Sequence, residues 1–211
     1  MTDLALNIAP TPLDASTAPA DTLLGLPTSM PLVLDLDGTL IRGDLLYKSF
    51  FSILRRNPLI VLACARWLLR GRAALKRQLA LRNRIDWKRL EFRQEVVALA
   101  RREQAAGRMI VLATAADAVL AGQLAFRLPL FDQVIASDGA RNLKGPAKAA
   151  LLREQFPAGF IYAGDSKSDL AVWARASGII LVNTHRSVRE AALALGRPTL
   201  DLSPAASVNK H

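Results

Sequence analysis

The sequence has little capacity for sulfur or imidazole chemistry. It contains one cysteine and two histidines among 211 residues. A single cysteine excludes an internal disulfide and suits a reducing cytoplasm, and Cys64 lies in an apolar run, which is typical of a packing residue. His185 follows a predicted strand, where a loop role is usual, and His211 is terminal. We therefore base no function on these residues.

Basic residues are absent from the first thirty positions, which contain four prolines, three aspartates and many Ala, Thr and Ser. Without a positively charged start and a sustained apolar core, this segment is not a secretory signal. Its composition predicts that residues 1–30 are mostly disordered. Residues 201–211 include Ser203-Pro204-Ala205-Ala206-Ser207 and are predicted to form a flexible tail. The sequence contains no internal repeat.

Between these ends the chain has the composition of a globular domain, since 51% of all residues are apolar and 22% are charged. Short apolar runs alternate with segments of helical periodicity, which predicts an α/β fold with a doubly wound, Rossmann-like parallel sheet. Ligands of such sheets bind beyond the carboxyl ends of the strands. We assign residues 31–43 and 90–200 to a catalytic core, with a last helix opened by a capping box of Ser187 and Glu190. The predicted strands cover residues 32–34, 109–113, 133–136, 160–163 and 179–182.

Two carboxylates stand where the first predicted strand ends. Asp35-Leu36-Asp37-Gly38-Thr39 follows the apolar run Leu32-Val33-Leu34. Residues two apart in an extended chain point to the same side, so Asp35 and Asp37 leave the strand together and repel each other. A hard divalent cation with oxygen ligands, such as Mg²⁺, relieves that repulsion. For this segment alone, the alternative is a solvated Asp-Gly turn that closes a hairpin.

Three later segments supply the other groups that phosphoryl chemistry needs. The run Met109-Ile110-Val111-Leu112-Ala113 ends at the hydroxyl of Thr114, and Lys144 can neutralise phosphate charge. Phe160-Ile161-Tyr162-Ala163-Gly164 ends at Asp165, four residues before Asp169. Taken singly, Thr114 has a strand-end cap as its alternative interpretation, and a lone lysine such as Lys144 is usually a solvated loop charge. Because all four segments occur in this order, we favour a catalytic site.

In this combination the segments resemble the haloacid-dehalogenase-like hydrolase superfamily. Its pattern is Asp-x-Asp at a strand end, Thr or Ser at a second strand end, Lys, and then Gly-Asp-x-x-x-Asp. The resemblance extends from about Pro31 to Asn183. It is greatest to the phosphoserine-phosphatase-type branch, in which a helical cap is inserted just after the first motif, and it implies a cap over residues 44–89.

A narrower resemblance is carried by three strings of residues. They are similar to the phosphatase-like domain that is fused to some polyprenyl (4-hydroxybenzoate-type) prenyltransferases. The strings are Leu112-Ala113-Thr114-Ala115-Ala116-Asp117, Ser137-Asp138-Gly139 with Asn142-Leu143-Lys144-Gly145, and Tyr162-Ala163-Gly164-Asp165-Ser166.

The superfamily resemblance implies a role for each acidic residue. Asp35 would attack phosphorus and form an aspartyl-phosphate, and Asp37 would act as general acid and then as general base. Mg²⁺ would be bound by the Asp35 carboxylate, the Asp37 backbone carbonyl and Asp165. The acid at Asp37 favours phosphate transfer over dehalogenation, since the dehalogenases of the superfamily lack it. Gly164 and Asp169 would support the site from behind.

The resemblance also implies how phosphate is bound. Thr114 would donate a hydrogen bond to a phosphate oxygen, and Lys144 would stabilise both Asp35 and the charge of the transition state. Lys148 competes with Lys144 for the lysine role. We favour Lys144, because it matches the Lys-Gly of the family that precedes a helix.

The positive charge of the chain is concentrated around the predicted cap. The formal charge is +10, and residues 55–93 hold twelve cations but only two acids, Asp86 and Glu91. Arg66 interrupts the apolar run there and excludes a transmembrane helix, which requires about 20 apolar residues. The twelve cations are Arg55, Arg56, Arg66, Arg70, Arg72, Lys76, Arg77, Arg82, Arg84, Lys88, Arg89 and Arg93.

Two interpretations of this basic and apolar segment stay open. An amphipathic surface with aromatic residues suits anionic lipid, or a substrate with several negative charges such as a prenyl or lipid phosphate. The plainer interpretation, which we favour slightly, is that Leu and Trp form the core of the cap and arginines coat its outside.

The predicted function is hydrolysis of a phosphomonoester, with a lipid or prenyl phosphate as one candidate substrate. The alternative is an accessory module of a separately encoded membrane prenyltransferase, with little or no hydrolysis of its own. Nucleic-acid binding is least favoured, because a basic patch gives only salt-dependent affinity and no recognition motif is present. We expect a cytoplasmic protein that acts on a phosphorylated small molecule or lipid, with peripheral contact to the inner face of an anionic membrane as a further hypothesis.

Overall fold

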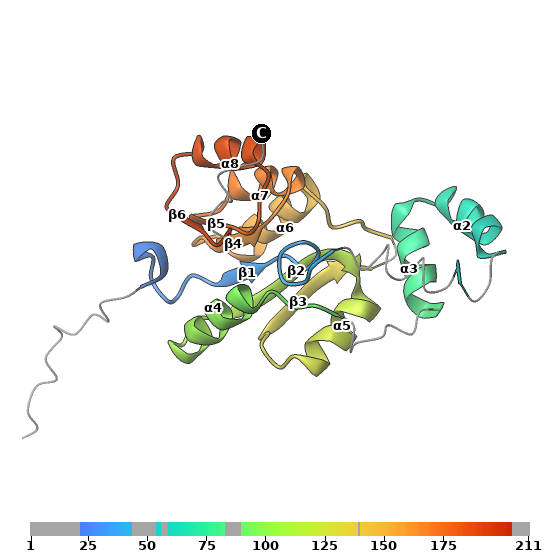
Figure 1. Ribbon diagram of the computed structural model, residues 1–211, viewed down its shortest axis with the longest axis horizontal. Coiled ribbons are helices and arrows are strands. Elements are labelled where there is room, and N and C mark those ends of the chain that lie inside the picture. The colour runs from blue at the N-terminus through green and yellow to red at the C-terminus, as the bar shows by residue number, and fades with distance from the viewer. Residues whose placement is uncertain (1–21, 44–53, 56–58, 83–89, 139, 204–211) are drawn as a thin grey trace, which may run out of the picture.

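Six strands form one parallel sheet in the computed structural model of the chain (Figure 1). The structure describes residues 22–43, 54–55, 59–82, 90–138 and 140–203. The strands lie in the order β3-β2-β1-β4-β5-β6, and every neighbouring pair is parallel. The prediction of a doubly wound parallel sheet is therefore confirmed. The strands are β1 (Leu32–Leu34), β2 (Ile110–Asp117), β3 (Gln133–Ser137), β4 (Ile161–Gly164), β5 (Gly178–Leu181) and β6 (Thr199–Asp201).

Helices cover both faces of the sheet, because alternate strand residues point to opposite sides. Leu32 and Leu34 of β1 belong to an apolar cluster with residues of α4 (Gln94–Ala105) and α5 (Ala118–Arg127). Val33, between them, belongs to a second cluster on the opposite face of the sheet. That cluster includes residues of α6 (Pro146–Gln155), α7 (Leu170–Trp173) and α8 (Arg186–Leu193). Burial on both faces explains why these strands are continuous apolar runs in the sequence.

The strand order reverses at β1, and this reversal positions the predicted motifs. β2 and β3 lie on one side of β1, whereas β4, β5 and β6 lie on the other. A doubly wound sheet leaves a crevice beyond the carboxyl ends of its strands at such a point. Leu34 of β1 is in register with Ala163 of β4, and the backbone N–H of Asp35 donates to the carbonyl of Ala163 at 3.0 Å. The residues that follow β1 and β4 therefore meet at this crevice.

Residues 22–30 are ordered, although the sequence analysis placed them in a disordered segment. Leu23, in the short 3-10 helix η1 (Leu23–Gly25), is buried against the core. The buried guanidinium of Arg108 donates to the carbonyls of Leu26, Pro27 and Met30, and also pairs with Glu103 at 2.8 Å. These hydrogen bonds offset the conformational entropy that is lost when the segment is fixed. The composition of the segment does not reveal such partners. Residues 1–21 lie outside the described part of the chain.

Two helices are described within the predicted cap. α2 (Ile60–Leu68) and α3 (Arg72–Arg82) pack against each other through a small apolar cluster whose buried members are Ile60, Trp67 and Leu79. In Figure 1, α3 lies nearer the sheet and α2 lies at the outer end of the molecule. Within the described residues, no helix has the length and apolar character needed to cross a bilayer. The rest of the predicted cap, residues 44–53, 56–58 and 83–89, lies outside the described part.

The C-terminal part of the core differs from the prediction in two details. The last helix begins at Arg186 with His185 as its N-cap, and Glu190, instead of closing a capping box with Ser187, pairs with Arg186 at 2.8 Å. β6 begins at Thr199 and pairs with β5 at the edge of the sheet, so residue 201, assigned to the tail, is part of a strand. A strand of three residues is too short to give a periodic signal. Residues 204–211 lie outside the described part.

Candidate active site

Asp35 and Asp37 lie directly beyond β1, where the chain turns at Gly38. Gly38 has a φ of +78°, which favours glycine, and a Cβ there would overlap the Oδ2 atom of Asp165. The guanidinium of Arg93 donates to the carbonyl of Gly38 at 2.9 Å and holds the turn from the other side. The turn after β1 is therefore pressed against the acid that follows β4.

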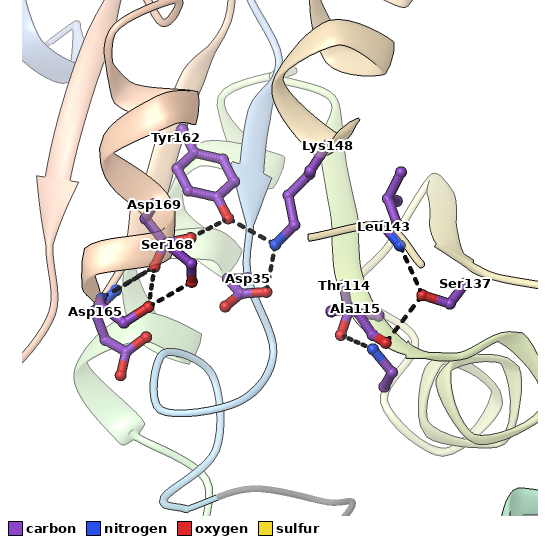
Figure 2. Close-up of polar contacts among 12 residues, drawn as sticks. Asp35, Thr114, Ala115, Ser137, Leu143, Lys148, Tyr162, Asp165, Ser168 and Asp169 are labelled. Carbon is purple, nitrogen blue, oxygen red and sulfur yellow. Dashed lines mark hydrogen bonds and ion pairs between the residues drawn. The ribbon is translucent and has the colours of Figure 1, made fainter. Parts of the chain in front are cut away.

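A buried chain of hydrogen bonds joins Asp35 to Asp169 (Figure 2). The ammonium of Lys148 donates to Asp35 Oδ1 at 2.7 Å and to the hydroxyl of Tyr162 at 2.8 Å. The Tyr162 hydroxyl donates in turn to Asp169 Oδ1 at 2.8 Å. Lys148 is 3% exposed and Asp35 is 9% exposed, so this pair is largely shielded from water. Lys148 belongs to α6, Tyr162 to β4 and Asp169 to the 3-10 helix η3 (Lys167–Asp169).

Asp169 holds the loop that carries Asp165. Its Oδ2 atom accepts from the backbone N–H of Asp165 at 3.2 Å, and from the backbone N–H and hydroxyl of Ser166 at 3.0 and 2.9 Å. A Cβ at Gly164 would approach the Asp169 carboxyl carbon to 2.7 Å, so only glycine leaves room for this contact. Both carboxylate oxygens of Asp169 are thus occupied within the protein, which fits a supporting position behind the site.

The crowding of acids shifts their pKa values. Burial, followed by the charges of Asp169 and Asp35, raises the pKa of Asp165 to about 7, although Arg93 acts in the opposite direction. Burial also raises the pKa of Asp35, against the lowering effect of the Lys148 ammonium. The pKa of Tyr162 is raised by burial and by the nearby Asp169, which keeps its hydroxyl protonated. The site therefore favours an additional positive charge beside Asp35 and Asp165.

The donor set fits a hard divalent cation. Asp35, Asp165 and Asp169 each offer a carboxylate oxygen, and these atoms lie within 4.8 Å of one another. Because the oxygens of Asp169 already accept four hydrogen bonds, Asp35 and Asp165 are the better carboxylate ligands of the three. The Asp37 carbonyl remains the third predicted ligand.

The lysine that contacts Asp35 is Lys148, whereas the sequence analysis favoured Lys144. Lys148 lies in the first turn of α6, on the same buried face as Ala149 and Leu152. Lys144 is exposed and precedes the helix, although it also lines the cavity in front of Asp35. The helix geometry explains the difference, since a residue three positions beyond its N-cap Gly145 is directed at the sheet.

Thr114 is fully buried beside the site. Its hydroxyl accepts from the backbone N–H of Ala116 at 2.9 Å and shapes the bulge within β2. Ala115 and Ala116, but not Thr114, are among the residues lining the cavity in front of Asp35. This cavity has a volume of about 570 Å³ and is also lined by Asp37. Thr114 thus lies one layer behind the cavity surface, and its contact with phosphate remains a prediction.

Helix α3, in the predicted cap, contacts the core beside the cavity through two cations. The ammonium of Lys76 donates to the carbonyl of Ala115 at 2.6 Å and to Asn142 Oδ1 at 2.9 Å. The guanidinium of Arg77 pairs at 3.1 Å with Asp117, which is buried and also caps α5. Two of the cations of the basic segment therefore dock the cap on the core.

Four residues of the site were not predicted from the sequence, because their neighbours in the sequence are typical of residues without a functional role. Tyr162 lies inside an apolar strand, and only its hydroxyl signals a polar partner at that depth. Arg93, Lys76 and Arg77 were counted only as part of the basic excess. No spacing in the sequence indicates which arginines of such a segment turn inward.

Comparison with known proteins identifies the family. Residues 32–173 match the family model of the haloacid dehalogenase-like hydrolases. The chain belongs to this family. The matched region begins with β1 and ends in α7, so this haloacid dehalogenase-like hydrolase carries Asp35, Lys148 and Asp165 within it.

Individual relatives agree with the fold. An uncharacterized protein of Sinorhizobium fredii, y4nM, is 42% identical over 153 residues, which are 72% of this chain and 30% of that protein, so the chain spans less than a third of its length. A solved protein of unknown function from Bordetella pertussis Tohama I has a TM-score of 0.63 at 18% identity and covers 83% of this chain and 100% of its own. Phosphoserine phosphatase in apo form has a TM-score of 0.56 at 13% identity, and the match covers 77% of this chain and 90% of that protein.

These matches confirm the predicted superfamily and a hydrolase of the α/β class. The structural similarities, at such low identities, show the fold alone. The narrower resemblance, to the domain that is fused to some prenyltransferases, gains no support from these matches and stays a prediction.

Proposed function

We propose that this hydrolase is a Mg²⁺-dependent phosphomonoesterase in which Asp35 is the nucleophile. The observation that carries the proposal is the contact between the Asp35 carboxylate and the buried ammonium of Lys148, 2.7 Å apart. The second Asp35 oxygen is not used by this bond, and Asp35 is among the residues that line the cavity. Attack of that oxygen on phosphorus would form an aspartyl-phosphate and release the alcohol, and water would then hydrolyse the acyl phosphate.

Lys148 would keep Asp35 ionised and correctly oriented. Burial favours the neutral acid, which is not nucleophilic, and the adjacent ammonium opposes that effect. Tyr162 would fix the ammonium in turn, because its hydroxyl accepts a hydrogen bond from Lys148, and Asp169 would hold that hydroxyl in place. Lys144, at the rim of the cavity, and Thr114, behind it, would bind the phosphate oxygens.

Asp37 would transfer the protons. It follows Asp35 by two residues and lines the same cavity. Its carboxyl group would protonate the leaving oxygen in the first step and would accept a proton from the attacking water in the second.

Asp35 and Asp165, with the Asp37 carbonyl, would bind Mg²⁺. When bound, the ion would offset the repulsion between the anionic nucleophile and the phosphate. The raised pKa of Asp165 supports this assignment, since it results from burial and then from the negative charges of Asp169 and Asp35, and a bound cation would offset these effects. Asp169 would keep the Asp165 loop in place.

The substrate would be a phosphorylated small molecule whose leaving group lies between the core and the cap, which we assign to residues 44–89. Leu68 and Leu75 of the cap and Leu120 of the core line the cavity together with Arg72 and Lys76. This mixture of apolar and basic groups suits an amphiphilic phosphate, such as a lipid or prenyl phosphate, better than a sugar phosphate. The intact acid set favours this enzyme over an accessory module without hydrolysis.

Hydrolysis of a generic aryl phosphate with Mg²⁺ tests the proposal. Asp35→Asn should abolish turnover, whereas Asp138→Asn, which changes an exposed aspartate on another loop, should not. A chelator should remove activity and Mg²⁺ should restore it. Turnover that persists in Asp35→Asn would eliminate the nucleophile assignment. A phosphate-release screen over sugar, amino-acid, nucleotide and lipid phosphates would then identify the substrate class.

A further inference from the structure

The outer face of α2 is apolar and exposed. Its members are Val61, Leu62, Ala65, Leu68 and Leu69, all exposed, with Leu62 and Leu69 at 72% and 90%. Their spacing of one, four, seven and eight residues gathers them on one side of the helix. The opposite side carries Ile60 and Trp67, which are buried against α3. The helix thus has a buried face that forms the cap core and a second apolar face that the cap core does not need.

α3 lies between α2 and the catalytic core. It packs on α2 through Leu79 and docks on the core through Lys76 and Arg77. Figure 1 shows α2 at the end of the molecule farthest from the sheet. Leu62 and Leu69 of the outer face are left uncovered by the rest of the described chain.

The charged residues of the described segment that contains α2 and α3 are all positive. The segment from Leu59 to Arg82 contains six cations and no acidic residue. Lys76 and Arg77 face the core, and Arg82 stacks on Trp67 at 4.7 Å. The other three, Arg66, Arg70 and Arg72, are exposed, and Arg66 neighbours Leu62 and Leu69 on the helix surface. Leucines flanked by arginines require a partner that is both apolar and anionic.

We propose that the outer face of α2 docks on an anionic lipid bilayer. Leucine side chains would enter the acyl boundary while the arginines would remain at the phosphate level. A second copy of the chain fits less well, since it would bring a matching set of arginines against the first. A nucleic acid would satisfy the arginines but leave the aliphatic side chains unused.

Leu68 links the docking surface to the active-site cavity. It belongs to the outer face and also lines the cavity, as does Arg72 at the start of α3. A docked cap would therefore hold the cavity mouth at the lipid surface. This step rests on the proposed function: the substrate would be a phosphomonoester with an aliphatic tail, taken directly from the bilayer.

Sedimentation of the full chain with vesicles tests the docking. We expect binding to phosphatidylcholine vesicles that contain phosphatidylglycerol at low salt, and little binding to phosphatidylcholine alone or at high salt. Arg66→Gln with Arg70→Gln should weaken partitioning on the order of 30-fold. Leu62→Ser with Leu69→Ser should weaken it by about tenfold or more. Phe126→Ser, which alters an exposed aromatic residue on α5 (89% exposed), is the matched control and should bind as the unaltered chain does.

Three results would overturn the docking proposal. They are no binding to the anionic vesicles at low salt, unchanged binding of the double leucine variant, or a dimer in solution that the leucine variant dissociates. Asp35→Asn should bind vesicles normally, so a failed nucleophile assignment would leave the docking result intact. Hydrolysis of a long-chain alkyl phosphate in vesicles, compared with hydrolysis of a soluble aryl phosphate, tests whether the substrate enters the cavity directly from the bilayer. The leucine variant should lose only the former.

Discussion

Replacing Lys148 tests the organisation of the site most directly. In Lys148→Met, Asp35 would lose the ammonium at 2.7 Å while Asp165 and Asp169 stay nearby. Removing one partner of a buried ion pair typically destabilises a protein by about 3–5 kcal/mol, because the other charge stays buried without compensation. Loss of a preorganised electrostatic contact lowers turnover by about 10²–10³-fold. Methionine keeps much of the lysine volume, so packing changes little.

Lys144→Met is the matched variant, since Lys144 lines the same cavity but is exposed. We expect it to change the free energy of unfolding by less than about 1 kcal/mol, and to act mainly by raising KM. Denaturant unfolding and aryl phosphate hydrolysis, measured on both variants, separate the two lysines.

A double-mutant cycle with Asp35→Asn isolates the pair. Once the Asp35 charge is gone, Lys148→Met should destabilise the chain by about 0.5–3 kcal/mol less than it does alone. Additive effects on stability would show that Lys148 does not interact with Asp35. Full turnover in Lys148→Met, with loss of turnover in Lys144→Met, would return the catalytic role to Lys144.

Further predictions concern pH, the hydrogen-bond chain and the turn after β1. Because the pKa of Asp165 is raised to about 7 from 3.8, the metal-free folded state retains a proton that the unfolded state releases. The stability contributed by this group is therefore present below about pH 4 and is lost as pH rises through 7. Mg²⁺ should raise the unfolding temperature more at pH 8 than at pH 6, and Asp165→Asn should reduce this pH dependence. Tyr162→Phe removes a hydroxyl that is hydrogen-bonded to both Lys148 and Asp169. We expect kcat to fall about tenfold and the acid limb of the pH–rate profile to move. An unchanged pH–rate profile would refute a positioning role for Tyr162. Gly38→Ala should abolish turnover through its overlap with Asp165, whereas Gly107→Ala, also at positive φ but in open space, should only lower stability by about 1 kcal/mol.

Five of the six strands could be predicted because they are short, mainly apolar runs, whereas β6 is not. β1 ends before Asp35 and β4 before Asp165, and both motifs follow from that pattern. The parallel order then brings these strand ends together. The sequence was therefore sufficient to predict that these acids lie together at the crevice, because the topology of the sheet alone determines their positions.

The lysine could not be assigned in the same way. Lys144 and Lys148 differ by about one helical turn, and only the start of α6 at Pro146 decides which side chain faces the sheet. The position of Lys148 on the face of Ala149 and Leu152 was the available signal, since a lysine rarely occupies a buried helix face without a partner. Tyr162 needed the position of that lysine as well, so it could be recognised only in three dimensions.

The cap was predictable only in its charge. The count of cations between residues 55 and 93 shows where the excess positive charge lies. It does not show which of these side chains face the core, because that depends on the rotation of α2 and α3 about their helix axes. Arg77 reaches the buried Asp117, and Arg66 does not reach the core. Pairing of this kind depends on distant core residues, which local periodicity does not include.

The contacts of Arg108 indicate on which side the protein can be attached to a surface. By gripping the carbonyls of Leu26, Pro27 and Met30 it fixes the chain at the amino ends of the strands, on the side away from Asp35. A chip or bead coupled on this side of the sheet, at residues 26–30, would therefore leave the cavity facing the flowing solution. Immobilised in that orientation, the protein could meet injected vesicles and phosphate esters without steric interference from its attachment point.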